Sequence, residues 1–295
     1  MSREPQEIDV LHQGRERVIC CLRAGDVLID PGPEVSSGAV VEALGGEAPR
    51  AILLTHIHLD HAGAAGALVR RWPEVEVVVH ERGARHLVDP SKLIASATRL
   101  YGDRMATLWG EIVPVPEENL RIVQGGETIG PFEVAYTPGH AQHHVAYLDR
   151  ETGVAYCGDV AGVRIAGGPV LPPTPPPDID LELWRASIDL VEGWGPERLA
   201  LTHFGVTGDV GEHLDALREA LALLGELARR TDQEGYMAAV QGIVRRESAP
   251  DVVEATFAAM PPDTLFAGLD RYWAKRASGP RAARPATVPG DVPDR

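Results

Sequence analysis

Short apolar runs separated by turn residues predict several strands near the N-terminus. Val18 to Leu22 and Val27 to Ile29 flank the turn Ala24-Gly25-Asp26, which is the pattern of a β-hairpin. Ala51 to Leu54 is apolar without alternation, as expected for a strand buried on both faces of a parallel sheet. Val75 to Val79 is rich in β-branched residues and predicts another strand.

Helical patterns alternate with these strands. Ser36 or Ser37 can cap a helix that runs to Leu44. The segment from Ala62 to Arg71 is rich in alanine and predicts a second helix. From Arg82 to Glu118 the apolar residues recur at helical spacing, and the pattern is broken at Pro90, Gly102 and Gly110.

Further short strands joined by tight turns are predicted in the middle of the chain. They are Leu120 to Val123, Glu127 to Ile129, Phe132 to Tyr136, Val145 to Leu148, Val154 to Tyr156 and Arg198 to Leu201. We expect the first three to form an antiparallel sheet, because Gly-Gly and Gly-Pro turns separate them. We expect the fourth and fifth to form a hairpin.

A segment rich in glycine and proline, residues 161–180, interrupts this pattern. It excludes regular structure and predicts an ordered loop or strap that borders the mouth of a site. Leu181 to Glu192 then predicts an amphipathic helix. Its inward residues are expected to be Leu183, Trp184, Ile188 and Val191.

The C-terminal part of the chain is predicted to be helical. Apolar residues at helical spacing indicate a long helix that starts at Asp209 or Glu212 and ends at Arg230. Further helices are expected at 233–246, 250–260 and 264–276. Such a region could complete the core, cover a substrate entrance or pair two subunits in a homodimer.

The last residues lack this periodicity. Residues 277–295 contain four prolines, and we expect a disordered tail. The predicted organisation is therefore a catalytic domain at 1–208, a helical region at 209–276 packed on it, and the tail.

Four metal-ligating residues are crowded into the loop after the buried strand at Ala51 to Leu54. His56, His58, Asp60 and His61 fall within six positions, before the alanine-rich helix. Neutral imidazole and carboxylate are good ligands for zinc and similar ions. His56 and His58 point the same way if the segment is extended, and Asp60 and His61 can face a second ion. The alternative, an Asp60 N-cap beside surface histidines, explains one histidine but not three.

This arrangement, His56-x-His58-x-Asp60-His61, resembles the signature of the metallo-β-lactamase-fold hydrolases. That family takes its other ligands from three distant positions, each in a loop after a strand. The matching residues are His140 in Thr137-Pro138-Gly139-His140, Asp159 in Cys157-Gly158-Asp159 and His203 in Thr202-His203.

The resemblance implies a binuclear metal centre. His56, His58 and His140 would hold one ion, Asp60, His61 and His203 would hold the other, and Asp159 would bridge the two. A hydroxide shared by the ions would be the nucleophile, and Asp60 would be the catalytic residue that orients it. Zinc is the default metal; iron or manganese also fits, because a His/Asp site without thiolate selects weakly.

The resemblance also implies the fold and the substrate class. The expected architecture is α/β (α+β): a four-layer αββα sandwich of two mixed sheets, with the C-terminal helices added to it. Within the family the ligand pattern is most similar to glyoxalase II and the lactonases, which implies hydrolysis of a small thioester, ester or lactone. His144 lies four residues after His140, as in many enzymes that resemble glyoxalase II, while His143 replaces a common glycine.

Substrate contacts are expected from three residues. They are His144 and the aromatic residues Tyr101 and Trp109, which lie on helices that the family often inserts over the site. The alternative for His144 is a place behind the metal ligands, and the alternative for each aromatic residue is a place in the core. Two other functions stay open: a mononuclear iron persulfide dioxygenase on the same fold, and a phosphodiester-directed or non-catalytic protein.

Composition limits the partners. The net charge of −15 argues against binding to a nucleic-acid backbone, so a small-molecule acyl substrate is the expected partner. The three cysteines include the adjacent pair Cys20 and Cys21, and no disulfide framework is visible. No apolar run has the length of a signal peptide core or of a membrane span. A cytoplasmic location is therefore expected.

Overall fold

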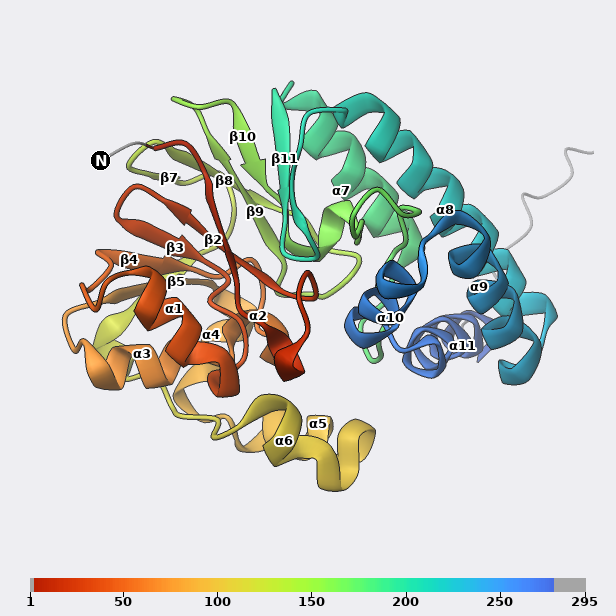
Figure 1. Ribbon diagram of the computed structural model, residues 1–295, viewed down its shortest axis with the longest axis horizontal. Helices are drawn as coiled ribbons and strands as arrows, with labels where there is room; N and C mark the ends of the chain where they lie inside the picture. Colours follow the sequence, from red (N-terminus) through yellow and green to blue (C-terminus); the bar gives the residue numbers. More distant parts are fainter. Residues whose placement is uncertain (1–2, 279–295) are drawn as a thin grey trace, which may run out of the picture.

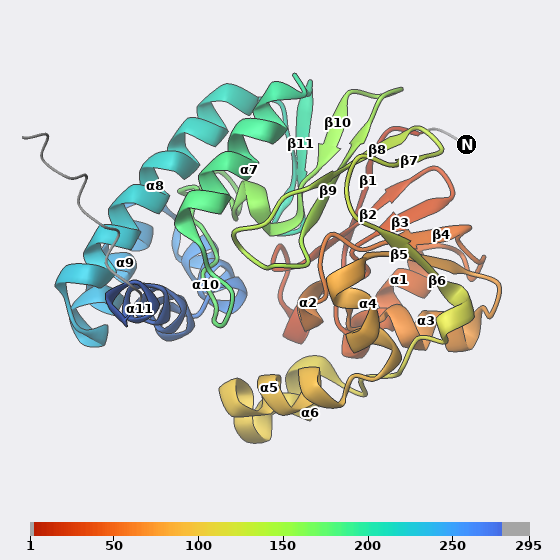
Figure 2. The same ribbon diagram turned by 180° about the vertical axis from the view of Figure 1, so that it is seen from behind.

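Two six-stranded β-sheets lie face to face in the computed structural model, which describes residues 3–278 (Figure 1). Helices cover the outer face of each sheet, so that the layers are helix, sheet, sheet and helix (Figures 1 and 2). This arrangement confirms the predicted αββα sandwich with two mixed sheets.

The first sheet contains the strands of the N-terminal half. Its first three strands pair antiparallel and the remaining neighbours pair parallel. In sheet order they are β1 (Gln6–Asp9), β2 (Cys20–Ala24), β3 (Val27–Ile29), β4 (Ala51–Leu53), β5 (Glu76–His80) and β6 (Leu120–Val123).

The second sheet contains the remaining strands, and its neighbours pair antiparallel except for β10 and β11. In chain order they are β7 (Thr128–Ile129), β8 (Phe132–Tyr136), β9 (Val145–Asp149), β10 (Val154–Tyr156), β11 (Arg198–Leu201) and β12 (Gly205–Thr207). The predicted hairpin of β9 and β10 is confirmed.

One predicted pairing was wrong. The strand β6 was assigned to an antiparallel sheet with β7 and β8, but it pairs parallel with β5, with Val77 opposite Leu120. The chain crosses from one sheet to the other at Gly125 and Gly126, both with positive φ. Glycines adopt such angles without strain, so a sequence pattern that looked like a hairpin turn is instead the crossover between sheets. The edge strands β1 and β12 were not predicted.

Alternate side chains of each strand pack into two different parts of the core, one between the sheets and one under the outer helices. Leu22 of β2 points between the sheets, whereas its neighbour Cys21 packs under the outer helices. The largest side chains between the sheets are Phe132, Tyr147 and Tyr156, and none of them is exposed. Burying such a ring contributes about 1.5–3 kcal/mol, so these residues hold the sheets together and fix the edge at which the loops meet.

The helices between Glu81 and Trp109 break at Pro90 and Gly102 and end before Gly110, as predicted, but residues 111–116 were expected to be helical and are not. The predicted helix from Ala62 to Arg71 is two helices, and the first begins earlier. The helices are α1 (Ser37–Ala43), α2 (Leu59–Ala62), α3 (Ala65–Arg71), α4 (Glu81–Val88), α5 (Ser91–Tyr101), α6 (Met105–Trp109) and α7 (Leu181–Gly193). Leu183 of α7 was expected to face inward, but it is 47% exposed, and Leu181 is buried in its place.

The predicted C-terminal helices are confirmed. They are α8 (Val210–Arg230), α9 (Gln233–Glu247), α10 (Pro250–Ala259) and α11 (Pro262–Ser278). Leu214, Leu217, Leu221 and Leu224 of α8 are buried in the same core as α7. None of the helices in residues 3–278 is both long and apolar enough to span a bilayer.

The predicted division at residue 208 stays a prediction. Most of the predicted tail lies outside the described residues.

Gly139, on the loop that carries His140, lies very close to the backbone of Trp184. Its φ is +135°, and a Cβ here would lie 2.3 Å from Trp184 Cα and 2.4 Å from Trp184 N. We predict that Gly139→Ala destabilises the protein by about 3 kcal/mol or more, measured by urea unfolding. In the matched control Gly242→Ala, an open position inside α9, stability should rise by about 0.5–1 kcal/mol. Equal stability of Gly139→Ala and the parent chain would contradict this account of the loop.

Candidate metal centre

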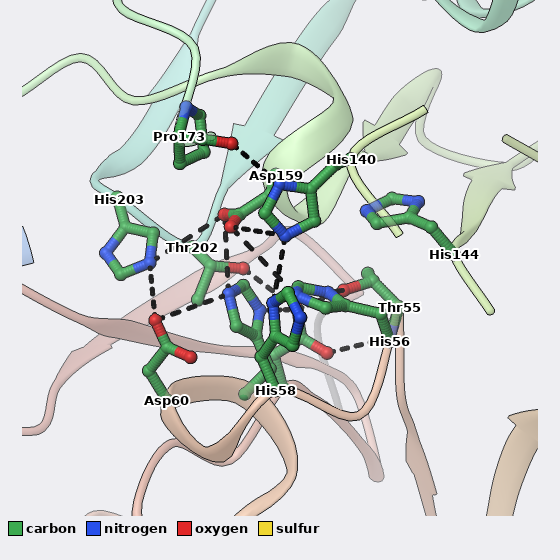
Figure 3. Close-up of polar contacts among 12 residues, drawn as sticks. Thr55, His56, His58, Asp60, His140, His144, Asp159, Pro173, Thr202 and His203 are labelled. Atoms are coloured by element: carbon green, nitrogen blue, oxygen red, sulfur yellow. Dashed lines mark hydrogen bonds and ion pairs between the residues drawn. The ribbon is translucent and has the colours of Figure 1, made fainter. Parts of the chain in front are cut away.

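Seven histidine and aspartate side chains from four separate segments converge where the loops of the two sheets meet (Figure 3). They form two groups, and within each group the candidate ligand atoms lie within 4.8 Å of one another. The first group is His56, His58, His140 and Asp159, and the second is Asp60, His61 and His203. The residues expected around each ion thus lie together, with Asp159 in the first group, and their role as metal ligands stays a prediction.

Three ring nitrogens of the first group are nearly in contact. His58 Nδ1 lies 2.9 Å from His56 Nε2 and 3.0 Å from His140 Nε2. Asp159 Oδ2 lies 3.3 Å from the same nitrogen of His140. His58 follows the extended loop after β4, whereas His140 comes from the loop between β8 and β9.

The second group meets the other oxygen of Asp159. Asp159 Oδ1 lies 3.3 Å from His61 Nε2 and 3.7 Å from His203 Nε2. Asp60 Oδ2 lies 3.5 Å from His203 Nε2 and 3.9 Å from His61 Nε2. The Asp159 carboxylate therefore stands between the groups and turns one oxygen to each.

Hydrogen bonds on the far side of two rings fix their tautomers. His140 Nδ1 donates to the Pro173 carbonyl (2.8 Å), and His203 Nδ1 donates to the Val18 carbonyl (2.6 Å). Carbonyl oxygens only accept, so Nδ1 carries the proton and Nε2 of each neutral ring presents a lone pair to the centre.

Asp30 plays the same part for two further rings. Its Oδ2 accepts from His61 Nδ1 at 2.7 Å and from Thr55 Oγ1 at 2.6 Å. Since the Thr55 hydroxyl donates to Asp30, its oxygen accepts from His56 Nδ1, 3.1 Å away. Thr202 Oγ1 also donates to Asp30 (2.9 Å). One buried carboxylate thus orients His61 directly and His56 through a hydroxyl.

Asp30 was missed as a site residue, because Asp30-Pro31-Gly32-Pro33 was interpreted only as the end of a hairpin. A signal was present in the sequence. Asp30 directly follows β3, and β3 pairs parallel with β4. The carboxyl ends of neighbouring parallel strands meet at one edge of a sheet, which is where sites form in such sheets.

The nitrogen and oxygen atoms of the site are better arranged to bind a metal than to form hydrogen bonds with one another. His61 Nε2 and Asp159 Oδ1 are buried and make no hydrogen bond within the described residues, because their contact is poorly aligned. Buried polar atoms without partners are rare in folded proteins. Imidazole lone pairs and carboxylate oxygens at this density are the ligand set that zinc, iron or manganese accepts.

The two groups differ in how they hold protons. Burial lowers the pKa of His56 well below its ordinary value and lowers that of His140 to about 4. Burial also opposes the charged form of His61, but Asp159 and Asp30 outweigh it and raise the pKa of His61 well above its ordinary value. The Asp60 hydrogen bond likewise raises the pKa of His203 against burial. The imidazoles of the first group therefore favour the neutral form, and those of His61 and His203 favour the protonated form.

A cleft of about 810 Å³ opens onto this centre. His58, Asp60, Asp159 and His203 line its floor. Tyr101 and Trp109, predicted as substrate contacts, both line its wall. Trp109 also packs in a small cluster with Leu59 and Ala97, so the core alternative holds for part of its surface.

His144 is not among the residues that line the cleft. It is fully buried and stacks on His56 with the ring centroids 5.0 Å apart. Its Nδ1 lies 2.8 Å from Thr137 Oγ1. The ring packs behind a metal-ligand candidate, which agrees with the alternative expected for His144 rather than with a direct substrate contact. The cleft is instead lined by the neighbouring His143, whose Nδ1 accepts from the Ile57 backbone N–H at 3.4 Å.

Comparison with known proteins identifies the family. The sequence model of the metallo-beta-lactamase superfamily matches residues 19–203, which include all seven candidate ligands. The chain belongs to this superfamily of metal-dependent hydrolases. The helices α8 to α11 lie outside the matched segment.

Named relatives share part of this chain. A metallo-beta-lactamase fold-containing protein of Sulfurisphaera tokodaii is 30% identical over 172 residues, 55% of this chain and 64% of that protein. A hydroxyacylglutathione hydrolase of Thermosynechococcus vestitus is 30% identical over 133 residues, 45% of this chain and 42% of the enzyme. The matches thus span less than two thirds of the length of either relative.

Solved structures support the fold. A metallo-beta-lactamase superfamily protein from Sulfolobus tokodaii aligns with a TM-score of 0.63 and 24% identity over 76% of this chain and 87% of that one. A protein described in a di-iron-bound form aligns with a TM-score of 0.50 and 29% identity, over 65% of this chain and 87% of that one. The first shows the fold alone.

Asp30 offers a test of how the rings are held. Asp30→Asn keeps the shape of the side chain but replaces one acceptor oxygen with an NH₂ group among four donors. We predict that metal affinity falls about 10–100-fold, measured by chelator competition. The control Asp26→Asn removes an exposed carboxylate that pairs with Arg50 and should leave metal affinity unchanged. Equal metal affinity of Asp30→Asn and Asp26→Asn would contradict the role of Asp30.

Proposed function

We propose that this protein is a two-metal hydrolase of a small thioester, ester or lactone. The observation that carries the proposal is the Asp159 carboxylate, which turns one oxygen to each of two complete ligand groups. Two divalent ions in such a site supply a Lewis acid for a carbonyl oxygen and lower the pKa of bound water toward neutrality.

The chain's own residues supply the rest of the chemistry. Asp60 and Asp159 are carboxylates of the site that also line the cleft, so in this proposal Asp60 would orient the attacking water and accept its proton. The imidazoles stay in one tautomer because Asp30, Pro173 and Val18 hold their outer nitrogens. This fixed arrangement costs no reorganisation when charge develops on the substrate.

The cleft supports an acyl substrate. Leu59, Pro175, Met260 and Leu265 give it apolar walls close to the polar floor. The volume of about 810 Å³ suits a molecule much smaller than a protein or nucleic acid. The likeness to a hydroxyacylglutathione hydrolase supports the thioester as the first substrate class to test.

The histidine and aspartate ligands do not determine which metal binds, so the metal has to be identified by measurement. No cysteine lies in either group, and Cys157, near Asp159, is fully buried with its pKa raised by burial. Imidazole suits zinc and iron, and carboxylate suits manganese, so this set of donors accepts all three metals. The similarity to a protein in a di-iron-bound form makes iron the metal to compare with zinc.

A substrate panel tests the proposed reaction. We predict that the metal-loaded protein hydrolyses at least one class among thioesters, nitrophenyl esters and lactones, and that chelation abolishes turnover until Zn²⁺ is restored. Asp159→Asn should lower kcat/KM by more than about a hundredfold, whereas the exposed control Asp215→Asn should not change it. Turnover of bis-phosphodiesters alone would reject the substrate class. One iron per chain with consumption of oxygen would reject hydrolysis.

The proton content of the two groups predicts a pH dependence of metal binding. A metal must displace the protons of His61 and His203, whose pKa values are raised, whereas His56 and His140 are already neutral. The ion that binds to the group of His61 and His203 must displace protons, so it should be the more weakly bound of the two. Its affinity should rise with pH, about tenfold per unit for each displaced proton.

The measurement is a chelator competition at pH 6, 7 and 8, corrected for protonation of the chelator. The affinity for the first ion should change little across this range. If the affinities for the two ions changed with pH in the same way, the two groups would not differ in how they hold protons.

A further inference from the structure

One wall of the cleft is basic in a chain of net charge −15. Arg82, Arg85, Lys92 and Arg99 all line the cleft from α4 and α5. From Arg82 to Trp109 the chain has five Lys and Arg residues, two Asp residues and no Glu. The acidic surface of the protein is thus interrupted at the entrance to the site.

The spacing of these residues turns their side chains to the same side. Lys92 and Arg99 are seven residues apart, which places them two turns apart on one face of α5. Ser96 lies between them on that face and also lines the cleft. Arg82 and Arg85 are one turn apart on α4. Both helices border the cleft on the side away from α10 and α11 (Figures 1 and 2).

These cations have no carboxylate partner within residues 3–278. Arg82 contacts Gln142 Oε1 at 3.2 Å, and Arg85 contacts His86 Nε2 at 3.2 Å. Lys92 and Arg99 make no hydrogen bond or ion pair to the described residues. Arg218 on α8, by contrast, pairs with three carboxylates.

Two carboxylates outside the metal groups also line the cleft. Glu81 accepts a hydrogen bond from Gln124 Nε2 at 2.6 Å, and Asp178 accepts weakly from the Gln142 backbone N–H at 3.5 Å. Neither forms an ion pair with the four cations. The balance of permanent charge on the cleft wall is therefore positive.

The opposite wall is apolar. Ala259, Met260, Pro261 and Leu265 face the cleft from α10, α11 and their connection, and Pro175 to Pro177 adds a rigid edge. A molecule that fills this cleft meets the metal groups at the floor, apolar contacts on one side and cations on the other. Clustered cations in a cleft with low-dielectric walls attract anions more strongly than the same charges on an open surface.

We infer that the α4–α5 wall, defined by Arg82, Arg85, Lys92 and Arg99, binds an anionic group at the end of the substrate remote from the cleaved bond. This inference rests on the proposed hydrolysis of an acyl substrate. The anion is a carboxylate or a phosphate, since both pair with guanidinium and ammonium groups.

Three matched thioesters test this inference on the metal-loaded protein. They share one acyl group, and their thiols end in a carboxylate, a phosphate or a neutral carboxamide. We expect kcat/KM for the better anion to exceed that for the carboxamide by about tenfold at low salt, and the preference to shrink as salt rises. The preferred anion identifies the source of the charge.

The double variant Lys92→Gln/Arg99→Gln removes two of the four cations at exposed positions. The ratio of kcat/KM between anionic and neutral thioesters should fall toward one. Arg85→Gln provides a second variant with a smaller decrease. The matched control Arg245→Gln/Arg246→Gln removes the same two positive charges from the exposed surface of α9 and should keep the parent ratio.

A binding measurement separates this inference from the proposed function. The thioether analogues of the carboxylate and carboxamide compounds cannot be hydrolysed, and their affinities are measured by calorimetry. If no thioester is turned over but the thioether carboxylate binds more tightly, and the double variant loses that preference, the anion site stands and the proposed reaction fails. Equal binding of the two thioethers overturns the anion site. A preference that survives in the double variant also overturns it, because the metal centre would then be binding the carboxylate.

Discussion

The structure depends on nitrogen lone pairs that crowd together with too few protons between them. His58 Nδ1 lies 2.9 Å from His56 Nε2 and 3.0 Å from His140 Nε2, and the outer nitrogens of His56 and His140 already hold their protons. One proton on His58 Nδ1 can make a good hydrogen bond to only one of the other two nitrogens, so lone pairs are left to repel unless a cation lies among them. Protons meet part of the same need in the second group, where carboxylates raise the pKa values of His61 and His203. A divalent ion in each group meets it fully.

The surrounding fold holds the imidazole rings in this arrangement through hydrogen bonds to their outer nitrogens. The acceptors that fix the rings come from places far apart in the sequence: Asp30 after β3, Val18 before β2 and Pro173 in the Gly- and Pro-rich segment. The strap at residues 161–180 therefore has a structural reason for its length, since it carries the acceptor for His140 and an edge of the cleft. The same strap contacts the C-terminal helices through the Thr174 hydroxyl, which donates to the Leu265 carbonyl at 3.0 Å.

The ligands could be predicted from the sequence because each follows a strand whose apolar pattern is plain. Asp30 follows an equally plain strand, but a single aspartate before Pro31 is also a common turn residue, so its role needed the parallel pairing of β3 with β4. The pairing of β6 could not be predicted, because Gly125 and Gly126 look like a hairpin turn in the sequence but form the crossover between the two sheets. His144 and His143 are adjacent and chemically identical, and only the backbone direction decides which one reaches the cleft.

The most direct test is a crystal of the protein grown without chelator, with the metals located by anomalous scattering. The account predicts two peaks about 3.5–4 Å apart, with one oxygen of Asp159 directed at each. His56, His58 and His140 should surround one peak, and Asp60, His61 and His203 the other. A single peak at full occupancy, or metals bound away from these side chains, would contradict the account.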